Sequence, residues 1–375
     1  MRVFIATSIL YIALAIGQSL SSRIVYQFPQ QPNWIENIAV RQNGNLVLTL
    51  LTSPEIFQVA KPWEKSPSTE LIHRFSGFDG LLGITETCPD TFVVVGGNFS
   101  GIGVSFPGSF SAWEVNIADK KTTVNKIVNV PEAAFLNGVV ALPWDRNIVL
   151  IAESALGKVY RLDVKAKKYD VILGGQYLEP TAEVVPPIGV NGVQIRGDFL
   201  YWSHSSLRKV FRVKLDRAGR VAAKATIDQV ANVNTTAIFL DDFTFDKKGG
   251  IWAVTNINGK LLYVTPEGNS TVAAGSETEL TVAGDTAAAF GRNVKDKGIL
   301  YVGTGGSLAM PVNGTITEPG KVVAFDTHGY GRKRKYLEVP DDETRTSHFA
   351  HPSSSRMPNS KVLSDRVRKR FEEVE

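Results

Sequence analysis

The amino-acid sequence predicts an all-β protein: a six-bladed β-propeller closed by its N-terminal strand and followed by a polar C-terminal tail. Three observations carry this prediction. A pair of strand-like segments recurs along the chain at a nearly constant interval, and each copy continues into further segments that alternate apolar and polar side chains. No segment between residues 18 and 340 shows the sustained 3.6-residue period of an amphipathic helix.

Each copy of the repeat starts from an anchor residue that precedes an apolar strand by about ten residues. The six anchors are Glu36, Leu82, Asn137, Asn191, Asp241 and Ala289. Successive anchors are 46 to 55 residues apart, an interval that is typical of arrays of supersecondary units. Four strands in each of six copies predict a six-bladed propeller.

The outer strands of each copy are short segments rich in β-branched and aromatic residues. The third segments are EIFQVA, SAWEVNI, GKVYRLDV, KVFRVKLD, GKLLYVTPEG and GKVVAFDTHG, and the fourth segments are TELIHRF, VNKIVNV, KYDVIL and KATIDQV. The sixth copy lacks an outer segment of its own. RIVYQFP, residues 23–29, precedes the first anchor as LIHRFSG precedes the second. We therefore expect residues 23–29 to complete the last blade and to remove an exposed sheet edge.

The two ends of the chain are predicted to lie outside the propeller, which takes residues 18–340. Residues 1–17 have the pattern of a secretory signal peptide: Arg2, an apolar stretch, and small residues at Ala15 and Gly17. The apolar stretch is shorter than the roughly 20 residues that span a bilayer, so we expect no stable membrane span. The predicted location is the secretory pathway or the cell exterior. Residues 341–375 are polar and charged, which predicts a flexible tail.

Charge, cysteine content and glycosylation sequons bear on the partners of the protein and on its location. The net charge of the 375 residues is +4, and basic runs occur only at residues 331–335 and 366–370, so nucleic acid is not an expected partner. The single cysteine, Cys88, excludes an internal disulfide. Sequons for N-glycosylation, which agree with secretion, occur at Asn98, Asn234, Asn269 and Asn313.

The anchors are expected to converge, because the innermost strand of each propeller blade lines the central channel and starts at one of its mouths. The polar anchors are Glu36, Asn137, Asn191 and Asp241. They present carboxylate and amide oxygens, the hard ligands that suit calcium or magnesium rather than zinc. Leu82 and Ala289 make the rest of the ring apolar. In the alternative interpretation, the Asn-Gly pairs at residues 137–138 and 191–192 are simply turns that lead into strands.

Two sequence segments resemble the SMP-30/gluconolactonase/LRE-like family of six-bladed propellers: NGVQIRGDFLYWSHS from residue 191 and DDFTFDKKGGIWAV from residue 241. The resemblance extends over residues 30–326. In that family a divalent metal, usually calcium, is bound by one Glu, two Asn and one Asp, and the Asp also serves as base. The resemblance therefore implies a calcium-dependent lactonase or esterase with Asp241 as the base. The implied metal ligands are Glu36, Asn137, Asn191 and Asp241.

Finer details of the sequence are similar to a fungal branch of that superfamily, the hetero-Diels–Alderases of tropolonic sesquiterpenoid biosynthesis. The strings concerned are NWIENIAVRQNGNLVLT, GLLGITET, SFSAWEVNI, DDFTFD and AAAFGR. This resemblance implies a secondary-metabolite enzyme that removes water from a hydroxylated tropolone or phenol. The ortho-quinone methide so formed adds to a humulene-type alkene and gives a dihydropyran, a cycloaddition that requires no cofactor.

Candidate catalytic and substrate-binding residues follow from this chemistry. Acid–base groups assist the loss of water, and the candidates are Glu36, Asp241, Asp242 and His204. The candidates for binding a flat arene and a hydrocarbon macrocycle are Trp34, Phe135, Trp202, Asp242, Phe243, Phe290 and Arg292. Alternative interpretations place Trp202 in packing between sheets, His204 at the surface, and Arg292 in an ion pair with Asp285.

Three functions from different classes are open at this point. They are a pericyclase acting on small hydrophobic substrates, a calcium-dependent lactonase or esterase, and a non-catalytic propeller that binds a hydrophobic metabolite. The sequence contains no G-x-S-x-G elbow, no G-x-G-x-x-G turn and no P-loop. Serine hydrolysis, hydride transfer and phosphoryl transfer are therefore not expected.

Overall fold

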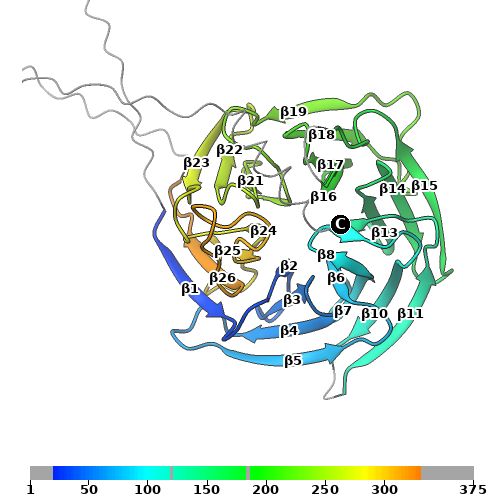
Figure 1. Cartoon of the computed structure of the whole chain (residues 1–375). Helices are drawn as coiled ribbons and strands as arrows, with labels where there is room; N and C mark the ends of the chain where they lie inside the picture. The colour runs from blue at the N-terminus through cyan, green and yellow to red at the C-terminus, as the bar shows by residue number, and fades with distance from the viewer. Residues whose placement is uncertain (1–19, 119–120, 183–185, 331–375) are drawn as a thin grey trace, which may run out of the picture.

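The computed structural model describes residues 20–118, 121–182 and 186–330. Within these ranges the regular structure is entirely β, and six four-stranded sheets surround a central axis like the blades of a propeller (Figure 1). The predicted fold class is confirmed. The described residues contain no helix that is long and apolar enough to cross a membrane. The predicted signal peptide and tail lie outside the described residues.

Each blade is a four-stranded antiparallel sheet, in which the first strand named lies nearest the axis and the fourth lies outermost. Blade one contains β2 (Ile35–Val40), β3 (Leu46–Leu50), β4 (Glu55–Ala60) and β5 (Ser68–Arg74); blade two contains β6 (Gly80–Cys88), β7 (Thr91–Gly97), β10 (Ser111–Asn116) and β11 (Thr123–Asn129). Blade three contains β12 (Leu136–Leu142), β13 (Asp145–Glu153), β14 (Lys158–Asp163) and β15 (Lys168–Gly174); blade four contains β16 (Val190–Arg196), β17 (Phe199–His204), β18 (Lys209–Lys214) and β19 (Asp228–Asn232). Blade five contains β20 (Phe243–Phe245), β21 (Ile251–Val254), β22 (Leu261–Val264) and β23 (Ser270–Ala274); blade six contains β24 (Asp285–Phe290), β25 (Ile299–Thr304), β26 (Lys321–Asp326) and β1 (Ser22–Gln27). A small hairpin of β8 (Phe99–Gly101) and β9 (Val104–Ser105) leaves blade two after β7.

The N-terminal strand closes the ring as predicted. β1 pairs antiparallel with β26, from Ser22 opposite Phe325 to Gln27 opposite Lys321. The strand also contributes to the core, because the Val25 side chain is buried in the cluster of blades one and six. Since β1 covers the last free edge of β26, the first and last described strands hold the propeller together.

Deletion of residues 22–27 is expected to cause aggregation or loss of folding, because it exposes the edge of β26 and removes buried apolar surface. Size-exclusion chromatography and thermal unfolding measure the effect. Val25→Asp, at a buried position of β1, should lower the melting temperature, whereas Ile24→Asp, at a position that is 53% exposed, should be tolerated. A monomeric deletion variant with an unchanged melting temperature would contradict the closure.

The outer strand of blade four starts later than its sequence predicts. The segment KATIDQV, residues 224–230, was expected as strand, but β19 begins at Asp228. The chain between β18 and β19 first folds back on itself, where Leu215 and Val221 form an isolated bridge and Ala225 donates its backbone N–H to Ala222 O. These local turns use the backbone groups that an earlier start of the strand would need.

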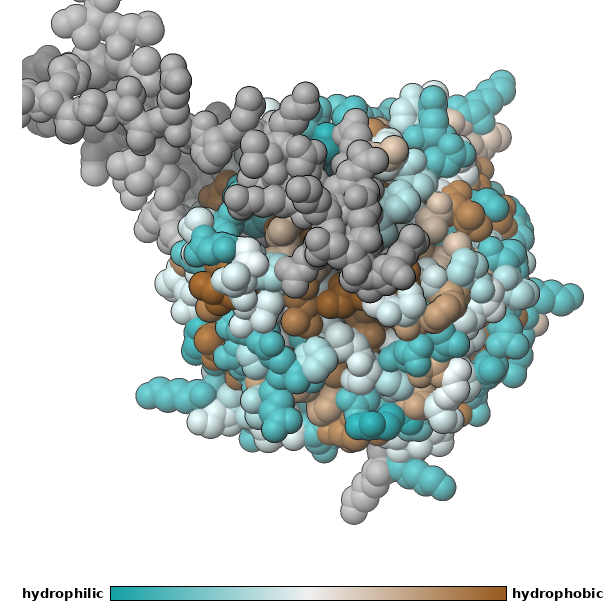
Figure 2. Space-filling view, viewed as in Figure 1, coloured by the Kyte–Doolittle hydropathy of each residue, from teal (hydrophilic) through white to brown (hydrophobic). Residues whose placement is uncertain are grey.

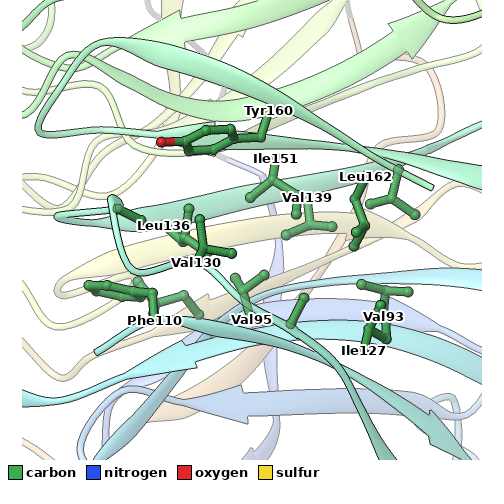
Figure 3. Packing of buried hydrophobic residues seen from close by; sticks show 14 of the residues in the cluster. Val93, Val95, Phe110, Ile127, Val130, Leu136, Val139, Ile151, Tyr160 and Leu162 are labelled. Atoms are coloured by element: carbon green, nitrogen blue, oxygen red, sulfur yellow. The ribbon is translucent and has the colours of Figure 1, made fainter. Parts of the chain in front are cut away.

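Apolar side chains from facing blades fill the space between the sheets, as Figure 3 shows for blades two and three. Val93, Val95 and Phe110 on blade two lie against Leu136 and neighbouring side chains of blade three. Each fully buried side chain of this size contributes about 1.5–3 kcal/mol relative to an exposed one. The alternation of apolar and polar residues in the sequence is thus explained by burial between blades.

The sequon asparagines differ in access. Asn234, Asn269 and Asn313 are exposed, whereas Asn98 is half-buried and its Oδ1 atom is buried without a hydrogen-bond partner. Cys88, at the end of β6, is an exposed free cysteine. Three of the four sequons therefore present an accessible side chain for a glycan.

Candidate active site

The four polar anchors line one pocket at a mouth of the central channel. Glu36 lies on β2, Asn137 on β12 and Asn191 on β16, while Asp241 lies two residues before β20. Backbone hydrogen bonds hold Asp241 in line with β21, because its N–H donates to Val254 O at 2.9 Å. The structure thus brings together residues from four blades that are up to 205 positions apart in the sequence.

The anchor side chains face the channel because the innermost strands start with an irregular register. The pairing of β12 with β13 shifts between Leu136 and Val139, and that of β16 with β17 shifts between Val190 and Val193. Asn137 and Asn191 lie within these irregularities and have no paired residue on the neighbouring strand. Their side chains can therefore point toward the axis.

The glycines that follow the two asparagines are required by the close approach of neighbouring blades. A Cβ atom on Gly138 would lie 2.5 Å from Asn191 O, and one on Gly192 would lie 2.1 Å from Asp242 Oδ1. Both glycines belong to strands, so the interpretation of the Asn-Gly pairs as turns is wrong.

In blade six the position of the anchor belongs to Thr286 rather than to Ala289. The register of β24 shifts between Asp285 and Ala287, as that of β2 shifts between Ile35 and Asn37. The Thr286 hydroxyl donates to the backbone oxygen of Ile35 at 2.5 Å. The sequence repeat misplaced this anchor by three residues because the connection between β24 and β25 is three residues longer than the connection between β2 and β3.

The apolar part of the pocket wall comes from loops and not from the remaining anchors. Leu82 is fully buried in the core between blades two and three, and Ala289 lies toward the other end of the channel. The pocket is lined by Trp34, Leu51, Ile102, Gly103, Phe135, Pro186, Ile188, Phe239, Asn256, Ile257 and Ala309, in addition to the four polar anchors. Apolar side chains gather near the centre of the face seen in Figure 2, over the axis of the ring in Figure 1.

Burial shifts the acid–base properties of the carboxyl groups at the axis. It raises the pKa of Glu36 to about 7, against the opposing effect of the Trp34 Nε1–H, which donates to Glu36 Oε2 at 2.6 Å. The pKa of Asp241 is raised well above its usual value, first by burial and then by the nearby Glu36. The pKa of Asp242 is raised to about 6, again chiefly by burial. These groups therefore hold protons, or favour a cation, at a pH where exposed carboxyls are ionised.

The donor set of the pocket suits a hard cation. Glu36 and Asp241 supply carboxylates, and the Oδ1 atoms of Asn191 and Asn256 are buried without hydrogen-bond partners. Asn256 also donates from Nδ2 to Asp241 Oδ2 at 2.7 Å. Among the described residues no cluster of three or more His, Cys, Asp or Glu side chains is arranged to bind a metal. Any cation here would therefore be bound by a mixed set of carboxylates and amides.

Comparison with known proteins identifies the family. No family model matches the chain. A protein of Phoma sp. that is named "Putative hetero-Diels-Alderase" is 35% identical over 318 residues, which cover 78% of this chain and 88% of that protein. A protein of Sarocladium schorii with the same name and the label asR5 is 31% identical over 349 residues, covering 84% of this chain and 86% of the relative. The chain belongs to the hetero-Diels–Alderase family of enzymes.

Solved structures agree with the fold of this chain. A luciferin-regenerating enzyme superposes with a TM-score of 0.59 at 13% identity, covering 83% of this chain and 96% of that one. Regucalcin from Agrobacterium tumefaciens, described as a calcium-binding protein, superposes with a TM-score of 0.55 at 14% identity, covering 82% and 94%. At this level of identity the likeness supports the propeller fold alone.

Three predicted site residues are packed in the interfaces between blades and do not line the pocket. Trp202 is fully buried, stacks on Phe211 at 5.8 Å and donates from Nε1 to Tyr177 O. Phe243 is fully buried between blades four and five. His204 is buried as well, its Nε2 lies 2.9 Å from Glu179 O, and burial lowers its pKa to about 4. Alternation along a strand sends these side chains into the sheet interface, away from the axis.

Phe290 and Arg292 lie toward the opposite mouth of the channel, whereas Asp242 lies between the two mouths, close enough for its charge to raise the pKa of Glu36. All three line a separate hollow with the later parts of the innermost strands. Arg292 donates from Nη1 to Val40 O and to Glu86 Oε2. It therefore links blade six to blades one and two, and it neither reaches the pocket nor pairs with Asp285.

Asn256 and the loop residues of the pocket were missed by sequence reasoning. Asn256 has a φ of 50°, in the left-handed region where asparagine is favoured over most residues, and follows β21 closely. Ile102 and Gly103 belong to the loop between β8 and β9. None of these residues occupies a position that recurs in the six copies of the repeat, so the pattern of anchors could not predict them.

Proposed function

We propose that the protein is a hetero-Diels–Alderase of secondary metabolism that joins an ortho-quinone methide to a humulene-type alkene. The quinone methide is formed from a hydroxylated tropolone or phenol, and the product is a dihydropyran. The observation that carries this proposal is a pocket that combines buried carboxyl groups with an apolar wall, in a chain that is 35% identical to a named relative.

The carboxyl groups fit the first step, the loss of water. A proton must reach the leaving hydroxyl group while a base accepts the proton of the ring hydroxyl. Glu36, whose pKa lies at about 7, is suited to donate a proton near neutral pH. Asp241 interacts directly with the Glu36 charge, so only one of the two readily carries a negative charge at a time. The pair therefore contains an acid and a base side by side.

The apolar wall fits the second step. The heterodiene and the alkene form one carbon–carbon and one carbon–oxygen bond while the π bonds rearrange, so no proton, leaving group or electron is exchanged. Such a step is accelerated mainly by holding both partners in the reacting geometry. Side chains such as Phe135, Ile188 and Phe239 offer apolar contact for that purpose.

In a second, cation-bound form, a divalent cation, calcium above all, is proposed to take the place of the proton that Glu36 and Asp241 share. Its ligands would be Glu36, Asn137, Asn191 and Asp241, with Asn256 as a further oxygen ligand. When bound, it would supply a Lewis acid that polarises a substrate oxygen. The unpartnered Oδ1 atoms of Asn191 and Asn256 support this proposal, because buried acceptors without donors are costly.

Calcium is expected to raise the melting temperature, and more so at higher pH. The folded-state pKa of Glu36 lies above its usual value of 4.5, at about 7, so the chelator-treated protein should lose stability as pH rises across that interval. A cation offsets the charge, and at about 100 times its Kd it adds about 2.7 kcal/mol. Thermal scans from acidic to alkaline pH, with calcium or with chelator, measure both effects. Glu36→Gln should weaken both the stabilisation by calcium and the loss of stability with rising pH. A melting temperature that does not respond to chelator would contradict the proposed cation site.

We also propose that the protein enters the secretory pathway. The observations that support this are the predicted signal peptide at residues 1–17 and the three exposed sequon asparagines. N-terminal sequencing of protein from the native host should begin at Gln18. Retention of residues 1–17 on intracellular protein would refute the assignment.

The proposed reaction is tested by supplying purified protein with a hydroxymethyl-tropolone-type alcohol and a hydroxylated humulene. The expected product is a single enantiomer of the dihydropyran. The parallel assay offers a panel of aldonolactones, since the mixed ligand set also suits a calcium-dependent lactonase. If the protein opens lactones and the adduct is racemic and forms no faster than without enzyme, the protein is a hydrolase and not a pericyclase. Tight binding of the substrates without turnover of either class would indicate a non-catalytic propeller.

A further inference from the structure

A second hollow lies directly beside the acid-lined pocket. It is bordered by the turn after β21 and by the segment between β25 and β26, and we call it the side groove. Its lining includes Ile257, Asn258, Thr278, Met310 and Val312. Ile257 also lines the pocket that contains Glu36 and Asp241, so the two spaces share this residue.

The acid-lined pocket alone is too small for two substrates. Its open space is about 60 Å³, and that of the side groove is about 200 Å³. One water molecule occupies about 30 Å³ in the liquid, and sites for small organic ligands usually measure about 300–1,000 Å³. A reaction between two partners needs both of them in contact at once. The second partner therefore has to lie mainly outside the acid-lined pocket, and the side groove is an adjoining hollow that shares a lining residue with it.

The lining of the side groove indicates what it binds. Ile257, Met310 and Val312 offer apolar contact, and the flexible Met310 side chain can adapt to an irregular shape. Asn258 is only 2% exposed and its Oδ1 atom has no hydrogen-bond partner. Glu277, also in the lining, is ion-paired with Lys260 at 2.8 Å. An apolar ligand with one hydroxyl group matches this wall, because the hydroxyl can donate to Asn258 Oδ1.

We propose that the side groove is the subsite for the alkene, a hydrocarbon that carries one hydroxyl group. The reacting hydroxymethyl end of the arene then enters the acid-lined pocket, and Ile257, which lines both spaces, lies where the two partners meet. This inference rests on the proposed function. In the joining step the exocyclic carbon and the oxygen of the quinone methide each form a bond to one alkene carbon, and nothing is released.

Filling the side groove should weaken binding of the alkene and spare the arene. Met310→Trp is expected to raise the KM for the alkene at least about tenfold and to change the KM for the arene alcohol less than about twofold. Thr278→Trp, at an exposed position of the same groove, should act in the same direction if Met310→Trp does not fold. Ile227→Trp, in a separate surface hollow on blade four, is the matched control and should leave both KM values unchanged.

The hydroxyl contact has its own test. Asn258→Ala should raise the KM for a hydroxylated humulene, and it should leave the KM for the same hydrocarbon without the hydroxyl group near its native value. Because Asn313 lies in the same groove, deglycosylated protein is used throughout. If native protein gives no dihydropyran, the proposed function is overturned. If native protein gives product but Met310→Trp and Thr278→Trp leave the KM for the alkene unchanged, the side groove is overturned and the function stands.

Discussion

Asp241→Asn is expected to slow formation of the dihydropyran by about 10²- to 10⁴-fold, the usual contribution of one acid–base group. Some product should remain, because a quinone methide that forms slowly still reacts with a bound alkene. The substitution keeps the size of the side chain and its place beside Asn256 and removes only the ionisable group. Steady-state rates with both substrates measure the effect. A lactonase would instead lose the opening of lactones almost completely, since its base activates the attacking water.

The neighbouring aspartate provides the matched control. Asp242→Asn changes the same functional group one residue further on, but Asp242 lies between the two mouths of the channel and lines the separate hollow rather than the pocket. Its Oδ2 atom accepts a hydrogen bond from Asn37 Nδ2 and its Oδ1 atom accepts one from the Phe243 N–H, and the single oxygen of an asparagine keeps only one of them. The Asp242 charge also helps to raise the pKa of Glu36. Asp242→Asn should therefore lower the stability and shift the pH optimum downward, whereas the rate at that optimum should stay within a few fold of native. Equal loss in both variants would show that the charge at the axis, and not the position of Asp241, matters for the reaction.

Gly192→Ala is expected to destabilise the protein and to disrupt the pocket. The new Cβ atom would lie 2.1 Å from Asp242 Oδ1 and 2.8 Å from Asp242 Cα, so the backbone of blade four or blade five must move. Overpacking of this kind costs about 1–3 kcal/mol and occasionally more. The loss of stability is measured by thermal or denaturant unfolding, and a fall in the rate of dihydropyran formation should accompany it.

Gly174→Ala is the control for this substitution. Gly174 ends β15, and the nearest atom to its added Cβ would be 3.7 Å away, at ordinary contact distance. Its free energy of unfolding should change by less than about 0.5 kcal/mol. If Gly192→Ala were tolerated equally well, the blades would not require glycine here and the Asn-Gly pair would have no role in packing.

The fold could be predicted because its signals are local and repeated. Alternation of apolar and polar residues marks each strand, and six copies at a steady interval fix the number of blades. The closing strand was predictable for the same reason, since residues 23–29 fill the one place that the repeat leaves empty. Its partner in β26 is about 300 positions away, yet the third strand of every other blade in the described propeller already has an outer neighbour within its own repeat.

The direction in which individual side chains point could not be predicted from the sequence in the same way. The sequence places Phe290 and Arg292 close to the anchor at Ala289, but the anchor of blade six is Thr286 and the strand then carries these side chains to the other mouth. The connection after β24, residues 291–298, is three residues longer than the connection after β2, residues 41–45, so the spacing to the next strand indicates Ala289 instead of Thr286. His204 and Trp202 were misplaced because their strand buries both in the sheet interface.

The sequence by itself determined the propeller, its closure and the convergence of Glu36, Asn137, Asn191 and Asp241, because strand patterning and a constant repeat leave little freedom for where an innermost strand begins. The tertiary structure alone decided the rest of the pocket. Asn256, the loop between β8 and β9 and the side groove at Met310 lie outside the repeat, and their contacts are made between segments that share no periodic pattern. Such contacts depend on how loops of different blades meet over the channel, which a repeat within each blade cannot specify.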